Sequence, residues 1–580
     1  MSLYSDLSEV LTPYANKIKE LNGDKVDLPS NGYGTSGKVL RSTGTGTEWA
    51  TVGQPTDAQT AEAVSDWLDK HPEATTTVLD GSLTEEKLSE ALKEKVVNNY
   101  VTPQMYGAKA DGTTDDTTAI QNALNYLNTK GGGIVYFPVG IYLINSSVQS
   151  YPNIIMTGEG NNDSVIKIGV SEVSLITANN NVVENLGFDG NATVLSGRPT
   201  MNTILNARGA NIIVKDCYFS DAIGSCVASS AGNNVKVLHN TMNGYGDHAV
   251  YFSTNSSNIV VSHNIISRPN ADRGVEAIKF REGVNNVLIN NNIALNVPCF
   301  LMLDASGEVA CNNIIVIGNS ATTTNHSFLA ETRDAQHKNI IIASNVFENI
   351  GNYVAFSLVW NSHDGCQNIT ICDNIFKNYT EVGSIAGYTN DGIKNLSILR
   401  NVFDFAERSE AIRFRLGKGQ NVRIIGNTFT GQNEVTTFMT AANNTNVEIK
   451  DNAFCVGATW LFNLVNRSDI KITFTGNTVK QLKRRLIDGA NITGNSLVVI
   501  KGNNILDDNT SYPYFYARSD VSDPTKYLIK DNVVNGAEYN PSMIAYIPSY
   551  VGQMCVDNGV IYVAVATTAT TDWIALNATV

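Results

Sequence analysis

The sequence Val422-Arg-Ile-Ile-Gly-Asn427-Thr-Phe429 returns as Val447-Glu-Ile-Lys-Asp-Asn452-Ala-Phe454 and in ten further copies. Each copy has two apolar residues around a polar one, then a small or polar residue, Asn, any residue and an apolar one. The repeated asparagines are Asn240, Asn264, Asn292, Asn319, Asn345, Asn374, Asn401, Asn427, Asn452, Asn477, Asn503 and Asn532. Their eleven intervals run from 24 to 29 residues, with a mean near 26.5. A period of this length indicates a solenoid, a propeller or an array.

The chemistry of the repeat favours a solenoid of short strands. Apolar and polar residues alternate before each Asn, as a strand with one buried face requires. A copy is too short for a four-stranded blade, but it fits one coil of three strands. Coils stacked at about 4.8 Å would place each Asn on the next Asn. They would likewise stack the five consecutive aromatic residues Phe347, Phe376, Phe403, Phe429 and Phe454. We therefore expect the asparagines to form a structural ladder rather than a reactive site.

Length, charge and cysteine content limit the function classes. The chain has 580 residues and a net charge of −14, with 17% charged residues. This charge argues against a nucleic-acid or anionic-membrane partner, although a local basic groove could still hold an acidic polysaccharide. The eight cysteines show no paired metal spacing and are expected to be small buried side chains made in a reducing cytoplasm. No signal peptide and no membrane-spanning run is recognised, so we expect release from the cell by lysis.

The regions on either side of the repeat have a different composition. Residues 3–21 predict a helix interrupted by Pro13, and residues 30–53 predict a β-hairpin around Trp49. Two more helices are expected at 58–70 and 85–96. From about residue 541 the pattern again predicts short paired strands.

A long motif opens the solenoid. Val101-Thr-Pro-Gln-Met-Tyr-Gly-Ala-Lys-Ala-Asp111-Gly-Thr-Thr-Asp115-Asp116 leads into a helix with Ala119, Ile120, Ala123, Leu124 and Leu127 on one face, and then into Gly131–Gly133 and a strand. Such a helix would cover the open end of the solenoid. The motif resembles the opening of pectate-lyase-superfamily β-helix proteins, above all phage tailspikes and related depolymerases. The repeat extends this resemblance to about residue 535.

The resemblance implies an all-β protein with a right-handed, single-stranded parallel β-helix. It implies a virion-attachment region at 1–54, a helical neck at 55–99, a capping segment at 100–145, the β-helix at 146–540 and a small β-module at 541–580. It also implies a homotrimer in the virion tail, joined to the phage tail or baseplate through its N-terminus. The expected partner is a bacterial surface polysaccharide, and no cofactor or metal is expected.

Candidate site residues lie in the second half of each coil. Aligning the segments that begin at Asp247 and Val275 puts His248 over Glu276. Counting twelve residues from the coil asparagines gives Glu276, Asp304 and Glu331, a carboxylate at about the same place in three successive coils. Asp247, His248, Glu276, Asp304 and Glu331 are the candidate catalytic residues. The candidate substrate-binding residues are Arg281, Arg333, Trp360, Tyr388 and Arg413.

This set allows several chemistries. Side chains on adjacent or alternate coils would lie about 4.8 or 9.6 Å apart, near the carboxyl spacings of retaining and inverting glycosidases. A glycoside hydrolase is therefore the main hypothesis. A lyase is an alternative, with Arg281, Arg333, Arg413, His248 or Tyr388 acting on a uronate. A non-catalytic adhesin is a third, in which late tyrosines such as Tyr512 and Tyr516 bind the host. A bacterial enzyme unrelated to phage is a fourth. The charges could also simply solvate an outer face.

Overall fold

The computed structural model describes residues 38–42, 47–51, 100–195, 202–267, 276–305, 309–331, 335–351, 354–360, 366–384, 393–406, 412–416, 419–431, 435–488, 492–507, 526–539, 554–557, 560–564 and 573–575. The chain divides into two units, Met1–Asn98 and Asn99–Val580. In the first, β1 (Lys38–Ser42) pairs antiparallel with β2 (Thr47–Thr51), which confirms the hairpin expected at 30–53. The helices expected at 3–21, 58–70 and 85–96 lie outside the described residues.

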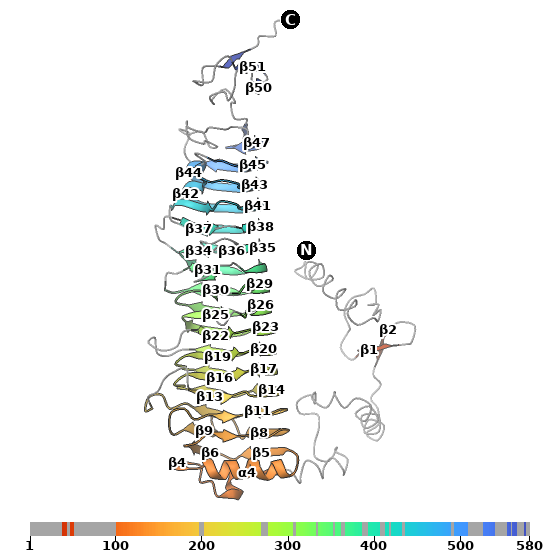
Figure 1. Ribbon diagram of the computed structural model, residues 1–580, viewed down its shortest axis with the longest axis vertical. Coiled ribbons are helices and arrows are strands. Elements are labelled where there is room, and N and C mark those ends of the chain that lie inside the picture. The colour runs from red at the N-terminus through yellow and green to blue at the C-terminus, as the bar shows by residue number, and fades with distance from the viewer. Residues whose placement is uncertain are drawn as a thin grey trace. The chain divides into compact units, whose positions relative to one another are not determined.

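The second unit is a stack of coils, each of which adds one strand to each of three parallel ladders (Figure 1). The first ladder precedes the repeated Asn. It consists of β3 (Tyr100–Val101), β5 (Gly133–Phe137), β8 (Ile154–Gly158), β11 (Val182–Glu184), β14 (Ala210–Lys215), β17 (Asn233–Leu238), β20 (Ser257–Ser262), β23 (Asn285–Asn290), β26 (Asn312–Ile317), β29 (Lys338–Ala343), β32 (Gln367–Cys372), β35 (Ile393–Leu399), β38 (Gly419–Ile425), β41 (Asn446–Lys450), β43 (Lys471–Thr475), β45 (Leu497–Lys501) and β47 (Tyr527–Lys530).

The second ladder follows the repeated Asn. It consists of β4 (Asp111–Asp115), β6 (Gly140–Ile144), β9 (Ser164–Ile168), β12 (Gly187–Asp189), β15 (Tyr218–Ser220), β18 (Thr241–Asn243), β21 (Ile265–Ser267), β24 (Ile293–Val297), β27 (Ser320–Thr323), β30 (Val346–Asn349), β33 (Ile375–Tyr379), β36 (Val402–Phe405), β39 (Thr428–Gly431), β42 (Ala453–Asn463), β44 (Thr478–Asp488), β46 (Asn504–Asp507) and β48 (Asn532–Val534).

The third ladder completes each coil. It consists of β7 (Val148–Gln149), β10 (Leu175–Ile176), β13 (Thr203–Asn206), β16 (Ser225–Ser230), β19 (His248–Ser253), β22 (Glu276–Arg281), β25 (Cys299–Asp304), β28 (Phe328–Glu331), β31 (Val354–Trp360), β34 (Glu381–Ser384), β37 (Ile412–Leu416), β40 (Val435–Ala441) and the second halves of β42 and β44. The strands and their parallel pairing confirm the β-helix.

The repeated asparagines form a buried ladder at the corner between the first and second ladders. From Asn240 to Asn532 each side chain is at most 2% exposed. At each step the Nδ2 group donates to the Oδ1 atom of the next Asn at 2.8–3.1 Å. That Oδ1 atom also accepts from the backbone N–H of the preceding Asn. The structural role predicted for these residues is confirmed.

Aromatic stacking fills the interior beside this ladder. The rings of Phe347, Phe376, Phe403, Phe429 and Phe454 stack in series, with centroids 4.9–5.7 Å apart. Offset stacked rings contribute beyond the apolar area that they bury. The series confirms the register that the sequence predicts. The seven cysteines from Cys217 to Cys455 are free, and five of them are buried.

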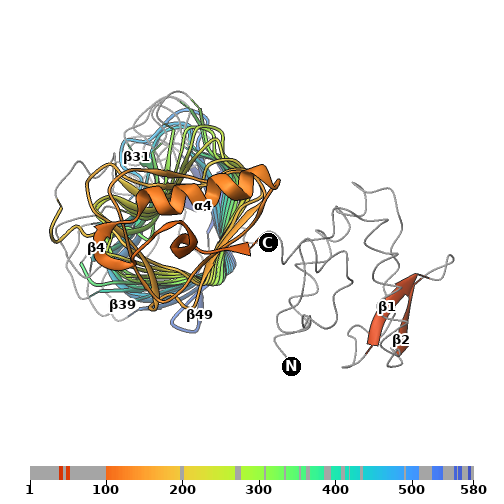
Figure 2. The same ribbon diagram turned by 90° about the horizontal axis from the view of Figure 1, so that it is seen from below.

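One helix closes the N-terminal end of the stack. The short helix η3 (Pro103–Tyr106) precedes α4 (Thr117–Thr129), and Figure 2 shows α4 lying across the end of the coils. Ala119, Ile120, Ala123, Leu124 and Leu127 of α4 are buried, as expected. Near the other end of the chain, β50 (Met554–Asp557), β51 (Val560–Ala564) and β52 (Trp573–Ala575) form an antiparallel sheet.

Candidate functional site

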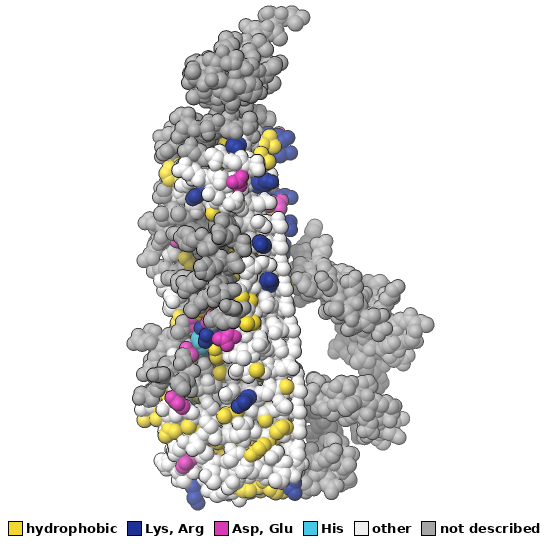
Figure 3. Space-filling model, in the orientation of Figure 1, with side chains coloured by type: hydrophobic (Ala, Val, Ile, Leu, Met, Phe, Trp, Pro, Cys, Tyr) yellow, Lys and Arg dark blue, Asp and Glu magenta, His cyan; other side chains and the backbone are white. Residues whose placement is uncertain are grey.

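The candidate site lies on the outer face of the third ladder. The strands β19, β22 and β25 run in register, so His248 pairs with Glu276 and Glu276 with Cys299. This confirms the predicted placement of His248 over Glu276. Figure 3 shows His atoms gathered with Lys, Arg, Asp and Glu atoms at mid-height on the left of the molecule, where the surrounding described surface is largely uncharged.

The predicted column of three carboxylates is wrong, because Glu276 does not share the row of Asp304 and Glu331. Asp304 pairs with Glu331, but it also pairs with Arg281, five residues after Glu276. The reason is the length of the connection before each strand. Residues 268–275 separate β21 from β22, whereas a single residue, Pro298, separates β24 from β25. Counting from the coil Asn therefore fails wherever this connection changes length.

His248 and Glu276 form a buried acid–base pair. They are 5% and 3% exposed, and His248 Nδ1 lies 3.0 Å from Glu276 Oε2. Neither atom has an aligned hydrogen-bond partner, because the contact is close but poorly oriented. The other ring nitrogen, His248 Nε2, lies 3.4 Å from Asp247 Oδ1. One imidazole thus stands between two carboxylates, of which Asp247 is the more exposed.

A second group of charges adjoins this pair. The ring of Tyr251 stacks on His248 with centroids 5.3 Å apart. Lys279 Nζ and Arg281 Nε lie 3.4 and 3.7 Å from Asp304 Oδ2. Burial lowers the pKa of Arg281, but a side-chain hydrogen bond with Tyr251 and the charges of Glu282 and Asp304 raise it more, so the net shift is upward. Asp304 therefore holds two cations beside the tyrosine.

Buried polar side chains continue from this pair along the third ladder. Ser225, His248, Glu276 and Cys299 occupy successive coils at the start of their strands and are all buried. Burial, and then the charge of Glu276, raise the pKa of the Cys299 thiol well above its usual value. Burial lowers the pKa of His326, which precedes β28, to about 4. This thiol and this imidazole are thus expected to be uncharged near neutral pH.

The other predicted site residues are more scattered. Glu331 of β28 pairs with Trp360 of β31, and Arg413 lies in β37, three coils beyond Glu331. Arg333 and Tyr388 lie outside the described residues. Sequence reasoning missed Tyr251 and Cys299. The spacing gave no signal for Tyr251, because residues three apart in a regular strand point to opposite faces.

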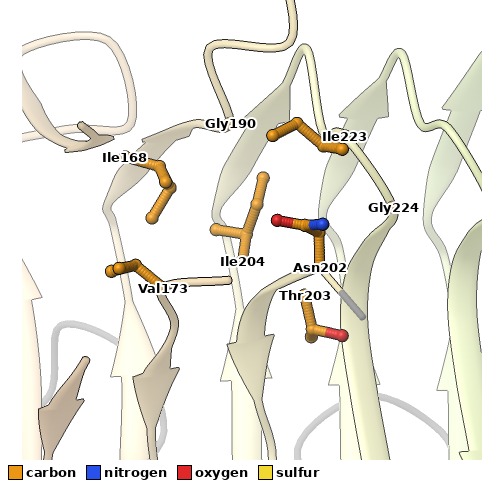
Figure 4. Close-up of a pocket in the computed structure, with 8 residues that line it drawn as sticks. All are labelled: Ile168, Val173, Gly190, Asn202, Thr203, Ile204, Ile223 and Gly224. Atoms are coloured by element: carbon orange, nitrogen blue, oxygen red, sulfur yellow. The ribbon is translucent and has the colours of Figure 1, made fainter. Parts of the chain in front are cut away.

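Two pockets of the described surface lie away from this cluster. Figure 4 shows one near the first coils, with the amide of Asn202 and the hydroxyl of Thr203 among Ile168, Val173, Ile204 and Ile223. The other is a groove along the first ladder, lined by asparagines and aliphatic residues. Neither contains a titratable side chain. Among the described residues, no group of three or more His, Cys, Asp or Glu could hold a metal ion.

The described coils define a parallel β-helix protein. Residues 101–324 match the family model described as rhamnogalacturonase A/epimerase, pectate lyase-like. The pre-neck appendage protein of Bacillus phage phi29 is 23% identical over 265 residues, which cover 39% of this chain and 30% of that protein. An SPbeta prophage-derived uncharacterized protein of Bacillus subtilis is 23% identical over 306 residues, 43% of this chain and 46% of that protein.

One similar solved structure comes from a phage. A tailspike mutant of Escherichia coli bacteriophage HK620, in complex with a pentasaccharide, aligns at a TM-score of 0.47 and 13% identity, over 76% of this chain and 80% of that one. The chain spans less than half the length of the curated relatives described above. Of the helices in the described residues, none is long and apolar enough to cross a membrane.

Proposed function

We propose that this protein is a phage tail component that binds a bacterial surface polysaccharide and hydrolyses it on the outer face of the third ladder. The phage relatives and the β-helix fold support the polysaccharide-binding part. The observation that carries the catalytic part is the buried His248–Glu276 contact, with Asp247 on the other ring nitrogen. Burying an incompletely satisfied acid–base pair costs free energy, and such pairs concentrate at functional sites.

Hydrolysis of a glycosidic bond requires two carboxyl groups in opposite roles. One donates a proton to the leaving oxygen, and the other takes a proton from the attacking water. Asp247 and Glu276 can share these roles, because the imidazole between them keeps the two carboxylates apart. The His248 ring contacts both groups and holds them in place. Lys279 and Arg281 lie further along the same strand, where they can bind hydroxyl or acidic substituents of the sugar chain.

The test is an assay of the purified protein against bacterial capsule and wall polysaccharides, read as new reducing ends. We expect Glu276→Gln and Asp247→Asn each to lower the rate at least 100-fold, because general acid–base catalysis contributes about that much. Asp404→Asn, which changes an exposed carboxylate of the second ladder, is the matched control. Full cleavage by both site variants, with the wild-type circular dichroism spectrum, would place the reaction elsewhere.

Elimination is a second candidate, favoured by the contact between Tyr251 and Arg281. A lyase removes the proton beside a uronate carboxylate, forms a carbon–carbon double bond and expels the glycosidic oxygen. Tyr251 is a possible base, and Arg281 or Lys279 could neutralise the uronate. Ultraviolet absorbance of an unsaturated uronate, lost in Tyr251→Phe, would select this reaction. Binding to cells without either product would leave a non-catalytic adhesin.

The proposal includes attachment to the virion through residues 1–54 and assembly into a homotrimer. A column of exposed branched aliphatic side chains on the second ladder supports the assembly. Its members share one position, directly after the buried Asn, and are 36–44% exposed: Ile265, Ile293, Val346, Ile375 and Val402. Ser320 takes this position between Ile293 and Val346, and exposed apolar surface of this kind marks contact sites.

A further inference from the structure

The first ladder has an unusual balance of charge. Its strands from β14 to β47 contain a single carboxylate, Glu448, although the whole chain has 55 acidic and 41 basic residues. The same strands contain nine basic residues: Lys215, Lys236, Lys338, Lys394, Arg423, Lys450, Lys471, Lys501 and Lys530. The outer face of the first ladder is therefore basic on an acidic protein.

The basic residues concentrate in the last coils. Five of the nine lie on β38, β41, β43, β45 and β47, and all five are exposed. Lys450, Lys501 and Lys530 fall in one column of paired positions, with Thr475 between the first two. Adjacent coils are about 4.8 Å apart, so Lys501 and Lys530 are one coil apart in this column, and Lys450 lies two coils before Lys501. In Figure 3, blue atoms follow the upper right edge of the molecule, beside these strands.

The carboxylates near this row hold it only weakly. Lys450 Nζ lies 3.8 Å from Asp451 Oδ2, and Lys501 Nζ lies 3.6 Å from Asp531 Oδ2. Both distances exceed the 2.7–2.9 Å of strong charge-assisted hydrogen bonds. Exposed pairs of this kind contribute about 0–1 kcal/mol. An anionic ligand can therefore replace these contacts at little cost.

We propose that the outer face of the first ladder, over coils β38 to β47, is a second binding surface for a polyanionic glycan of the host envelope. One exposed cation on each of these five coils suits a repeating polymer, because each coil offers a charge to a successive anionic unit. The polyanion is taken to be a glycan because the proposed function, on which this inference rests, is the binding of a bacterial surface polysaccharide. The surface lies on a different ladder from Asp247, His248 and Glu276. It thus goes beyond the proposed cleavage site and anchors the protein without cleaving.

The test measures binding of the full-length protein to three polymers over a range of salt. Polygalacturonate carries carboxylates, inorganic polyphosphate carries phosphates, and dextran is neutral. The test variant is Lys450→Gln/Lys501→Gln/Lys530→Gln. The matched control is Lys109→Gln/Lys377→Gln/Lys480→Gln, which removes three exposed lysines elsewhere and changes the net charge equally.

We expect at least one polyanion to bind, with affinity falling as salt rises. The test variant should weaken that binding at least tenfold, while the control stays within threefold. The polymer retained tells phosphate from carboxylate recognition. Three results would overturn the proposal: no binding of either polyanion at low salt, equal binding of dextran, or equal loss in both triple variants. A changed oligomeric mass in the test variant alone would also overturn it, by making this face a contact between copies.

Discussion

His326 shows what burial does to a single titratable residue. It is 6% exposed, and burial lowers its pKa to about 4 from an ordinary 6.5. The folded protein therefore binds fewer protons at this site than the unfolded chain does. The contribution of the buried neutral imidazole to the free energy of unfolding is fully present above pH 6.5. This contribution is lost as the pH falls through the folded-state pKa of about 4. Within that window the loss is at most about 1.4 kcal/mol for each pH unit.

We therefore expect His326→Gln to flatten the dependence of the thermal midpoint on pH between about 6.5 and 4. The slope is the quantity to compare, since the substitution also changes packing. Asn325→Ala, which changes the exposed neighbouring residue without removing a titratable group, should leave the slope as it is in the wild type. An unchanged slope in His326→Gln would mean that the imidazole is already charged in the folded protein.

At the scale of one structural element, the buried asparagine ladder can be compared with a second, exposed asparagine ladder on the outside of the same coils. Asn374 donates to Asn401, Ile342 and Cys372, and its Oδ1 atom accepts from the backbone and side chain of Asn345. Six residues earlier, Asn368 is exposed and donates to Asn339 in an outer ladder. Both side chains make ladder hydrogen bonds, but only the first is buried.

Asn374→Ala should therefore lower the free energy of unfolding by about 3 kcal/mol or more, because buried groups left without partners each cost about 1–3 kcal/mol. Asn368→Gly should cost less than about 1 kcal/mol, because water replaces the exposed bonds. Glycine is chosen because Asn368 has a φ of 55°, which alanine tolerates poorly. Denaturant unfolding of the two variants makes the comparison, and equal losses would contradict the burial argument.

Several structural elements could be predicted from the sequence alone, and one could not. The buried Asn ladder, the Phe stack and the cap helix follow from residue spacing, because a repeated side chain in a repeated coil must meet its own copies. The outer ladder was missed, although an Asn stands six residues before the buried Asn in nine successive coils, of which the eight from Asn234 to Asn421 belong to this ladder. Its residues have positive φ, which Asn tolerates well, and this was the available signal.

The site was harder to predict from the sequence than the buried Asn ladder was, for a different reason. His248 and Glu276 were aligned correctly because the motifs around them match. Glu276 was wrongly placed in the row of Asp304 and Glu331, because the connection before its strand is longer. The spacing within a strand is fixed by the backbone, whereas the length of a surface connection is not. Predicting a site that is assembled across coils therefore depends on the lengths of these connections, which vary from coil to coil.

At the scale of the whole β-helix, the three ladders present three different outer faces. The first is basic, the third has the acid–base cluster, and the second has the aliphatic column from Ile265 to Val402. A parallel β-helix keeps such columns separate, because each position in the coil recurs on the same face. Each face can therefore serve a different contact, and a change on one should leave the others intact.

The aliphatic column gives the test of assembly. Ile293→Lys/Ile375→Lys places two charges where the homotrimer proposal puts copies in contact, and desolvating them would oppose association. We expect the mass from light scattering to fall from about three times the 62.7 kDa chain to a single chain. Val139→Lys, at a 67% exposed residue of the cap, should leave the mass unchanged. A trimer that survives the double substitution would assign the contact to another face, and a monomeric wild type would remove the homotrimer from the proposal.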